Sequence, residues 1–124
     1  MHITGLHTTP AFCPLVADFD SGMMVTIPLF REDLTGDIDA IASVYQQKYT
    51  GPIVSFCADP AENGFLSSYA LHGLDRMEVS VAGNNDRILL TARFDNLGKG
   101  ASGAAIQCLN LISGEDETAG LVLA

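Results

Sequence analysis

The feature that most constrains this chain is an alternation of apolar and polar residues that occurs twice, on either side of a turn. Apolar Met77, Val79 and Val81 alternate with polar residues, and a second alternating run covers 87–94. Residues 83–86, Gly-Asn-Asn-Asp, have the composition of a tight turn because Gly and Asn tolerate positive φ. Successive side chains of a strand point to opposite faces, so the pattern predicts a β-hairpin with one apolar face.

Three further strands are predicted from short apolar runs. Segments 12–19, 23–30 and 53–57 are rich in Val, Ile and Phe and carry little charge, which is typical of buried strands. Pro14 and Pro28 lie inside the first two, where proline indicates a bulge or an edge position.

A first helix is predicted from an apolar stripe between residues 38 and 49. Thr35 or Asp37 can cap its start. Gly51-Pro52 is expected to end it, since Gly can take a left-handed cap and Pro cannot continue the helix. The stripe consists of Ile38, Ile41, Ala42, Tyr45 and Tyr49.

A second helix is predicted over 100–113 and is apolar almost all round. Its one polar stripe consists of Gly103, Gln107, Asn110 and Gly114, the last of which ends the helix. A helix that is apolar on every side is normally buried on every side, and 124 residues offer little bulk to bury it. We therefore expect it to pack against a second domain, a second subunit or a cofactor; the alternative is a central helix wrapped by its own sheet.

The order of these elements predicts the fold class. Hairpins dominate and regular βαβ alternation is absent, which favours an α+β domain with a mixed, largely antiparallel sheet covered by helices. The length fits one domain, and no linker or repeat divides residues 1–124.

Composition excludes several classes of partner. Fifteen Asp and Glu face six Lys and Arg, a net charge of −9, so we expect no nucleic-acid or anionic-membrane surface. No apolar run approaches the roughly 20 residues of a membrane span, and we expect no signal peptide.

Cysteines and histidines form no motif. Cys13, Cys57 and Cys108 lack the spacing of a zinc site, so no metal site is predicted. Lone cysteines fit the reducing cytoplasm, and each is expected to be a small buried hydrophobe. The histidines, which are His2, His7 and His72, are expected to be structural or exposed.

The strongest candidate for a binding site is the segment 95–105, DNLGKGASGAA. A strand is predicted to end at Phe94, and Lys99, flanked by glycines, opens the following helix. Free backbone N–H groups at the positive end of a helix suit an anion or a polar ligand group, although the Walker pattern GxxxxGK[ST] is absent. The alternative is a helix start built from small residues for close packing.

The same segment carries a resemblance to a known family. The sequence resembles the second domain of N-acetyl-gamma-glutamyl-phosphate reductases over essentially its whole length, and a looser version of the Lys99 segment is shared with aspartate-semialdehyde dehydrogenases. The residues that carry the resemblance are Gly5-Leu6, Pro10-Ala11-Phe12, Pro14, Val16–Phe19, Gly22-Met23, Val25–Leu29, Met77–Val81, Gly83-Asn84, Ile88–Leu90, Asp95–Gln107, Leu109–Leu111, Gly114, Asp116-Glu117 and Gly120-Leu121.

This resemblance implies a fold like the C-terminal domain of glyceraldehyde-3-phosphate and semialdehyde dehydrogenases. Residues 1–124 would be a C-terminal substrate and dimerisation domain, with helix 100–113 packed against an N-terminal Rossmann domain that binds NADP(H). That domain is expected to lie outside this chain, because 124 residues leave little room for a second domain. The family's enzyme reduces N-acetyl-glutamyl phosphate to N-acetylglutamate semialdehyde in arginine biosynthesis, by cysteine attack, loss of phosphate and hydride transfer.

The resemblance also implies which residues contact the cofactor. Asn96, Gly98, Lys99 and Gly100 would lie near the nicotinamide end of NADP. No catalytic residue carries over, because the nucleophilic cysteine belongs to the Rossmann part and the acid–base histidine would precede Met1. We expect the chain alone to be inactive, cytoplasmic and self-associating, with its own Rossmann domain and a small-molecule substrate as partners.

Two other functions fit the same residues. The chain could be a free-standing interaction or dimerisation module that has kept the fold without the enzyme. It could also belong to a reductase for a homologous acyl phosphate, such as aspartyl or aminoadipyl phosphate.

Overall fold

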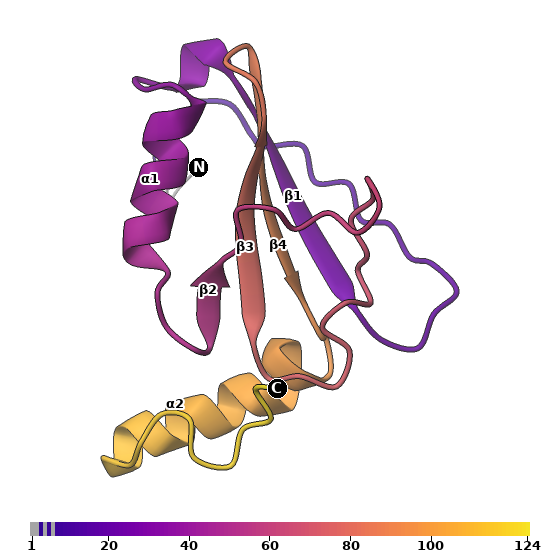
Figure 1. Ribbon diagram of the computed structural model, residues 1–124, viewed down its shortest axis with the longest axis vertical. Coiled ribbons are helices and arrows are strands. Elements are labelled where there is room, and N and C mark those ends of the chain that lie inside the picture. Colours follow the sequence, from indigo (N-terminus) through magenta and orange to yellow (C-terminus); the bar gives the residue numbers. More distant parts are fainter. Residues whose placement is uncertain (1–2, 4, 6) are drawn as a thin grey trace.

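The computed structural model describes residues 3, 5 and 7–124. A four-stranded mixed sheet forms its centre, with one helix along the sheet and a second across its end (Figure 1). This arrangement confirms the predicted α+β class. The elements, in chain order, are β1 (Met23–Phe30), η1 (Arg31–Asp33), α1 (Ile38–Lys48), β2 (Val54–Phe56), β3 (Met77–Gly83), β4 (Arg87–Phe94), η2 (Gly98–Ser102) and α2 (Gly103–Ser113).

The predicted hairpin is confirmed as β3 and β4, which form the middle of the sheet. The strand order is β1-β4-β3-β2, with β1 and β3 antiparallel to β4 and β2 parallel to β3. Gly83 takes the positive φ of the turn, at 112°. Asn84 does not; its side-chain oxygen instead accepts the backbone N–H groups of Asp86 and Arg87.

Alternation along β3 and β4 separates an apolar from a polar face. Val79 and Ala92 lie opposite each other on the apolar face, and Glu78 and Arg93 on the polar face. The buried hydrophobic core of the described residues is small and consists of Ile53, Leu71, Val79 and Ile88.

Helix α1 covers part of the apolar face, as its stripe predicts. All five stripe residues are at least half-buried, whereas the other side chains of the helix are exposed. Asp37, one of the two predicted caps, is the N-cap, and its carboxylate accepts the backbone N–H of Ala40. The prediction that Gly51 takes a left-handed cap is wrong, because the helix already ends at Tyr49 and Gly51 has no positive φ.

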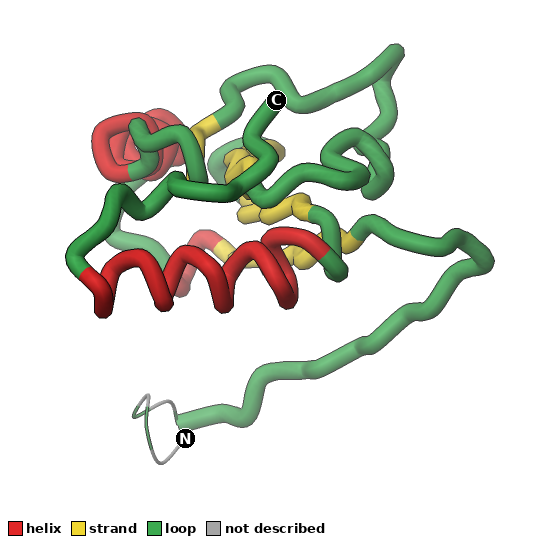
Figure 2. The backbone as a smooth tube through the Cα atoms, turned by 90° about the horizontal axis from the view of Figure 1, so that it is seen from below, coloured by secondary structure: helices red, strands yellow, loops and turns green. Residues whose placement is uncertain are grey.

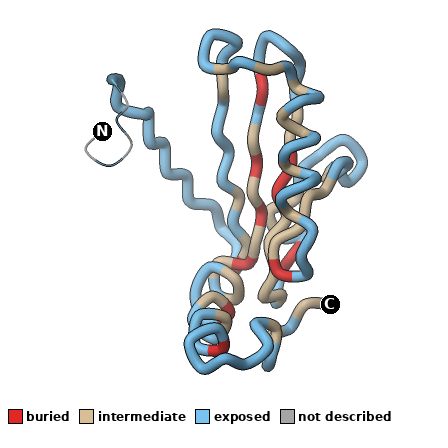
Figure 3. Tube along the Cα trace, turned by 90° about the vertical axis from the view of Figure 1, so that its left-hand side faces the viewer, coloured by how far each residue is buried: buried red, intermediate tan, exposed pale blue. Residues whose placement is uncertain are grey.

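The strand predicted over 12–19 is wrong. These residues form an exposed arm that leads away from the sheet (Figures 2 and 3), with Phe12 87% and Val16 98% exposed. The arm has no neighbouring strand to pair with, and Pro14 provides no backbone donor for one. β1 itself is an edge strand, as Pro28 predicts, but it is not buried: Ile27 is 50% exposed.

Helix α2 buries its polar stripe and exposes its apolar side chains. Figure 2 shows it crossing the end of the sheet, so the alternative of a central helix wrapped by its own sheet is wrong. Gly103 and Asn110 of the polar stripe are its buried residues, and Gly114 takes the left-handed cap with φ 74°. The apolar side chains point outward: Leu109 is 62% exposed, Leu111 58% and Ile112 85%.

The cysteines also depart from the prediction. Cys13 and Cys108 are exposed and only Cys57 is half-buried, so the expectation of three buried hydrophobes is wrong. Cys13 lies in the exposed arm and Cys108 on the outer side of α2, neither of which the sheet covers.

A buried arginine joins the loop 58–73 to the polar face of the sheet. Arg93 bonds Glu78 on β3 at 2.9 Å and Glu62 of the loop at 2.7 Å. Burial alone would raise the pKa of Glu78, but hydrogen bonds from Arg76 and Arg93 outweigh it and hold that pKa below its usual value. The guanidinium of Arg93 therefore ties this loop to the polar face of the sheet.

We expect Arg93→Met to lower the free energy of unfolding by about 3 kcal/mol, because it leaves the half-buried carboxylate of Glu78 without one of its partners. Urea titration followed by circular dichroism measures this. Arg87→Met is the matched control, since Arg87 is exposed at the start of β4, against the ring of Phe30, and it should cost less than about 1 kcal/mol. Equal losses in the two variants would contradict a special role for Arg93.

Candidate functional site

The predicted cofactor-binding residues lie together where β4 ends and α2 begins. Asn96, Gly98, Lys99 and Gly100 follow Phe94 directly, and the last three belong to the π-helical turn η2. Its N–H groups bond five residues back, as from Gly100 to the Asp95 carbonyl at 2.8 Å. The helix predicted from residue 100 thus becomes α-helical only at Gly103. Such widened turns are rare and frequently occur at functional sites.

The carboxylate of Asp95 organises this turn from inside. One of its oxygens, Oδ1, accepts the N–H groups of Leu97 at 2.7 Å and Gly98 at 3.1 Å, and Oδ2 accepts that of Gly73 at 2.6 Å. Its side chain is only 3% exposed. The expectation of free N–H groups for an anion is therefore wrong at Leu97 and Gly98, because the protein supplies the anion itself.

These hydrogen bonds decide the ionisation of Asp95. Burial alone would raise its pKa, but bonds from Gly73, Gly98, Leu97 and Ser21 outweigh burial and hold the pKa below its ordinary value of 3.8. The carboxylate is therefore charged at neutral pH, and its charge is balanced by backbone dipoles.

The glycines of the turn are required by close packing. A Cβ on Gly98 would lie 2.6 Å from the Leu74 carbonyl oxygen, and one on Gly100 would lie 3.0 Å from the ring of Phe94. Gly103 likewise packs against the side chain of Asp75. The expectation that small residues stand here for close packing is confirmed.

Lys99 carries the one positive charge of the turn. Its ammonium donates to Gln107 Oε1 at 2.7 Å, and Gln107 Nε2 donates in turn to Glu117 at 3.2 Å. Glu117 lies beyond the cap of α2, where the acidic run 115–117 is exposed. Lys99 is half-buried and held by a neutral amide, so its charge is not cancelled by direct contact with a carboxylate.

A polar cluster that the sequence does not predict lies beside Asp95. Ser21 Oγ is hydrogen-bonded to His72 Nδ1, which lies 3.7 Å from Asp95 Oδ2, and Gly22 N donates to the Asn96 side chain at 2.7 Å. Three segments far apart in the chain meet here, so no spacing in the sequence could have shown it. In the sequence, the only indication of this cluster is Asp95, an acidic residue that directly follows β4 and precedes the glycine-rich turn.

The other candidate groups lie apart from this site. His7 is exposed, as expected, while His2 lies outside the described residues. The described part of the chain holds no group of three or more His, Cys, Asp or Glu that could bind a metal. Nor does it contain a helix long and apolar enough to cross a lipid bilayer.

We expect Asp95→Asn to lower the free energy of unfolding at pH 7 by about 1–3 kcal/mol, because the amide group would face backbone donors. The folded pKa of Asp95 is depressed, so its contribution is present above pH 3.8 and is lost as the pH falls through the lower folded value. Melting temperatures of wild type and variant should converge in acid. Asp86→Asn in the exposed turn is the control and should change neither the stability at pH 7 nor its dependence on pH. A difference in melting temperature between wild type and Asp95→Asn that does not shrink as the pH is lowered would contradict this account.

Comparison with known proteins identifies relatives of the chain. No protein-family model matches the sequence. N-acetyl-gamma-glutamyl-phosphate reductase 2 of Nostoc sp. (strain PCC 7120) is 41% identical over 95% of this chain and 40% of its own length. The reductases of Trichormus variabilis and Allorhizobium ampelinum are 41% and 40% identical over 95% and 86% of the chain.

The chain spans about 40% of the length of the Nostoc and Trichormus reductases that it matches. The similarity extends across the sheet, the turn η2 and α2, as the resemblance of the Asp95–Gln107 run implied. The chain is therefore homologous, over nearly all of its length, to part of the N-acetyl-gamma-glutamyl-phosphate reductases.

Proposed function

We propose that this chain is the C-terminal substrate and dimerisation domain of an NADP-dependent reductase that converts N-acetyl-glutamyl phosphate to N-acetylglutamate semialdehyde in arginine biosynthesis. The names of its relatives support the reaction, and the 40% coverage supports a domain of a larger protein. The free cysteines of the described chain fit a protein of the cytoplasm.

The outward apolar face of α2 is the observation that carries this proposal. Leu109, Leu111 and Ile112 face water, whereas the buried core of the described residues contains only four hydrophobic side chains. Contiguous exposed apolar surface marks an interaction site, and the polar stripe of α2 already faces its own domain. The Rossmann domain of the full-length reductase is the proposed partner of this face.

The turn η2 is the proposed contact to the nicotinamide end of NADP(H). Lys99 offers a half-buried positive charge, which fits a polar or anionic cofactor group, and Gly98 and Gly100 let the turn pack closely against Leu74 and Phe94. Asn96 holds the start of the turn through Gly22. The cofactor supplies the hydride, and the residues of this chain position and orient it.

The chain alone is proposed to be inactive. Acyl-phosphate reduction of this kind needs an activated thiolate beside the cofactor. Cys13 and Cys108 are exposed and lie outside the turn, and Cys57 follows β2. The nucleophile and the acid–base histidine are therefore assigned to the remainder of the enzyme.

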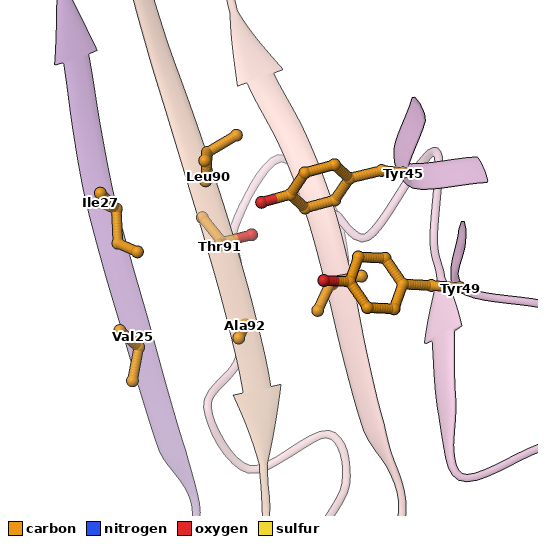
Figure 4. Close-up of a pocket in the computed structure, with 8 residues that line it drawn as sticks. Val25, Ile27, Tyr45, Tyr49, Leu90, Thr91 and Ala92 are labelled. Carbon is orange, nitrogen blue, oxygen red and sulfur yellow. The ribbon is translucent and has the colours of Figure 1, made fainter. Parts of the chain in front are cut away.

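Self-association is proposed through the uncovered half of the apolar sheet face. Figure 4 shows Tyr45 and Tyr49 reaching from α1 over β3 toward β4, while Val25 and Ile27 on β1 are not covered by the helix. Val25 is 41% and Ile27 50% exposed. A second copy packed face to face would bury both.

A chimaera tests the reaction. We expect the Nostoc reductase to remain an active NADPH-dependent enzyme when this chain replaces its matching region, and Lys99→Ala in the chimaera to raise the KM for NADPH about tenfold, the loss of about 1.4 kcal/mol of binding. Lys48→Ala, at the end of α1, is the control.

Two results would contradict the proposal. A folded chimaera that fails with N-acetyl-glutamyl phosphate, or that prefers aspartyl or aminoadipyl phosphate, removes the assigned substrate. NADPH formation by the chain alone from the semialdehyde, phosphate and NADP⁺ would show that it contains its own catalytic residues.

Light scattering tests the association. We expect a dimer or larger species at micromolar concentration, and the double variant Val25→Glu/Ile27→Glu to shift it toward monomer because charge cannot be buried without a partner. Thr26→Glu is the matched control, since Thr26 lies on the same strand but on the polar face. A wild-type chain that is monomeric at this concentration is incompatible with the proposal.

A further inference from the structure

His72 joins three segments of the chain at the end of the sheet that bears the candidate site. It lies in the loop 58–73, bonds Ser21 just before β1, and lies 3.7 Å from Asp95 just after β4. Its ring stacks on Tyr69, with centroids 4.4 Å apart and an interplanar angle of 11°. Both the position and the plane of the imidazole are therefore restrained.

The two sides of the Asp95 carboxylate have different roles. Oδ2 faces Gly73 N and His72 Nδ1, whereas Oδ1 accepts Leu97 N and Gly98 N at the start of the turn. A group that restrains Oδ2 restrains the rotation of the whole carboxylate, and with it the position of Oδ1. His72 Nδ1, at 3.7 Å, is beyond hydrogen-bond distance of Oδ2. It is connected to the carboxylate, and so to the backbone of η2, through Ser21, which bonds both groups.

Ser21 restrains the same ring nitrogen of His72, Nδ1. It is 2% exposed, and its neighbour Gly22 donates to Asn96 in the same segment. Gly22 has φ 108°, and a Cβ there would lie 2.5 Å from the Ser68 carbonyl oxygen, so this strand start packs directly on the His72 loop. The imidazole therefore joins two segments that each bond the start of the turn: Gly22 donates to Asn96, and Gly73 donates to Asp95.

We propose that His72 is a positioning residue for the segment Asn96–Gly100, acting through Ser21 and Asp95. This inference deepens the proposed function, since that segment is the proposed cofactor contact. His72 lies against Ser21, Tyr69 and Asp95, and the proposal assigns it no contact with the reacting atoms. No feature of its sequence neighbourhood distinguishes it from the other histidines.

Amide hydrogen exchange, measured by NMR on the chain itself, tests the inference without a cofactor. We expect His72→Phe, which keeps a ring against Tyr69 but removes Nδ1, to speed exchange at Leu97 and Gly98 about tenfold while β3 and β4 exchange as in wild type. His72→Asn, whose amide reaches the position of Nδ1, should restore slow exchange. His7→Phe is the control and should change nothing.

The same variants in the Nostoc chimaera provide a second readout. His72→Phe should raise the KM for NADPH with kcat little changed, and His72→Asn should restore it. If Lys99→Ala leaves the KM unchanged while the exchange result holds, the cofactor assignment fails and the positioning role stands.

Unchanged exchange at Leu97 and Gly98 in His72→Phe would overturn the inference, as would equal acceleration throughout the sheet, which indicates global destabilisation. Should His72→Phe not fold, Ser21→Ala removes only the hydroxyl that holds the ring. Ser21→Ala must then speed exchange at Leu97 and Gly98 in the same local way. Unchanged exchange at these two residues in Ser21→Ala would also overturn the positioning role of His72.

Discussion

The buried carboxylate of Asp95 is the interaction on which the functional end of this domain depends. It accepts three backbone N–H groups from two segments of the chain and stays ionised because these bonds outweigh the effect of burial. Through it the end of β4, the loop that precedes β3 and the π-helical turn η2 hold one geometry. Lys99 is presented from this turn, so one carboxylate sets the position of the charge proposed to meet the cofactor.

A second constraint is the small size of the internal core. Four buried hydrophobic side chains among the described residues contrast with exposed Leu, Ile and Phe on α2, on β1 and in the arm 12–19. These surfaces belong to different sides of the molecule, which Figures 1 and 3 show. The domain therefore presents separate apolar faces, which the proposed function assigns to another domain and to a second copy, and a polar end where Asp95 organises the turn.

Sequence patterns predicted the elements that form their own local contacts. The hairpin followed from alternation around Gly83, α1 from its stripe and Asp37, and the end of α2 from Gly114. The same reasoning failed for the arm, because an apolar run predicts a strand only if a partner strand is beside it. It also failed for Cys13 and Cys108, whose apolar character does not show which side of the chain the domain leaves uncovered.

The sequence by itself determined the class of fold and the location of the Asn96–Gly100 turn, because hydrophobic period and glycine placement act over a few residues. Only the tertiary structure decided that the polar stripe of α2 faces inward and that Ser21, His72 and Asp95 meet. Ser21 and His72 are 51 residues apart. Contacts over such a distance arise from the register and twist of the sheet, which no local pattern encodes.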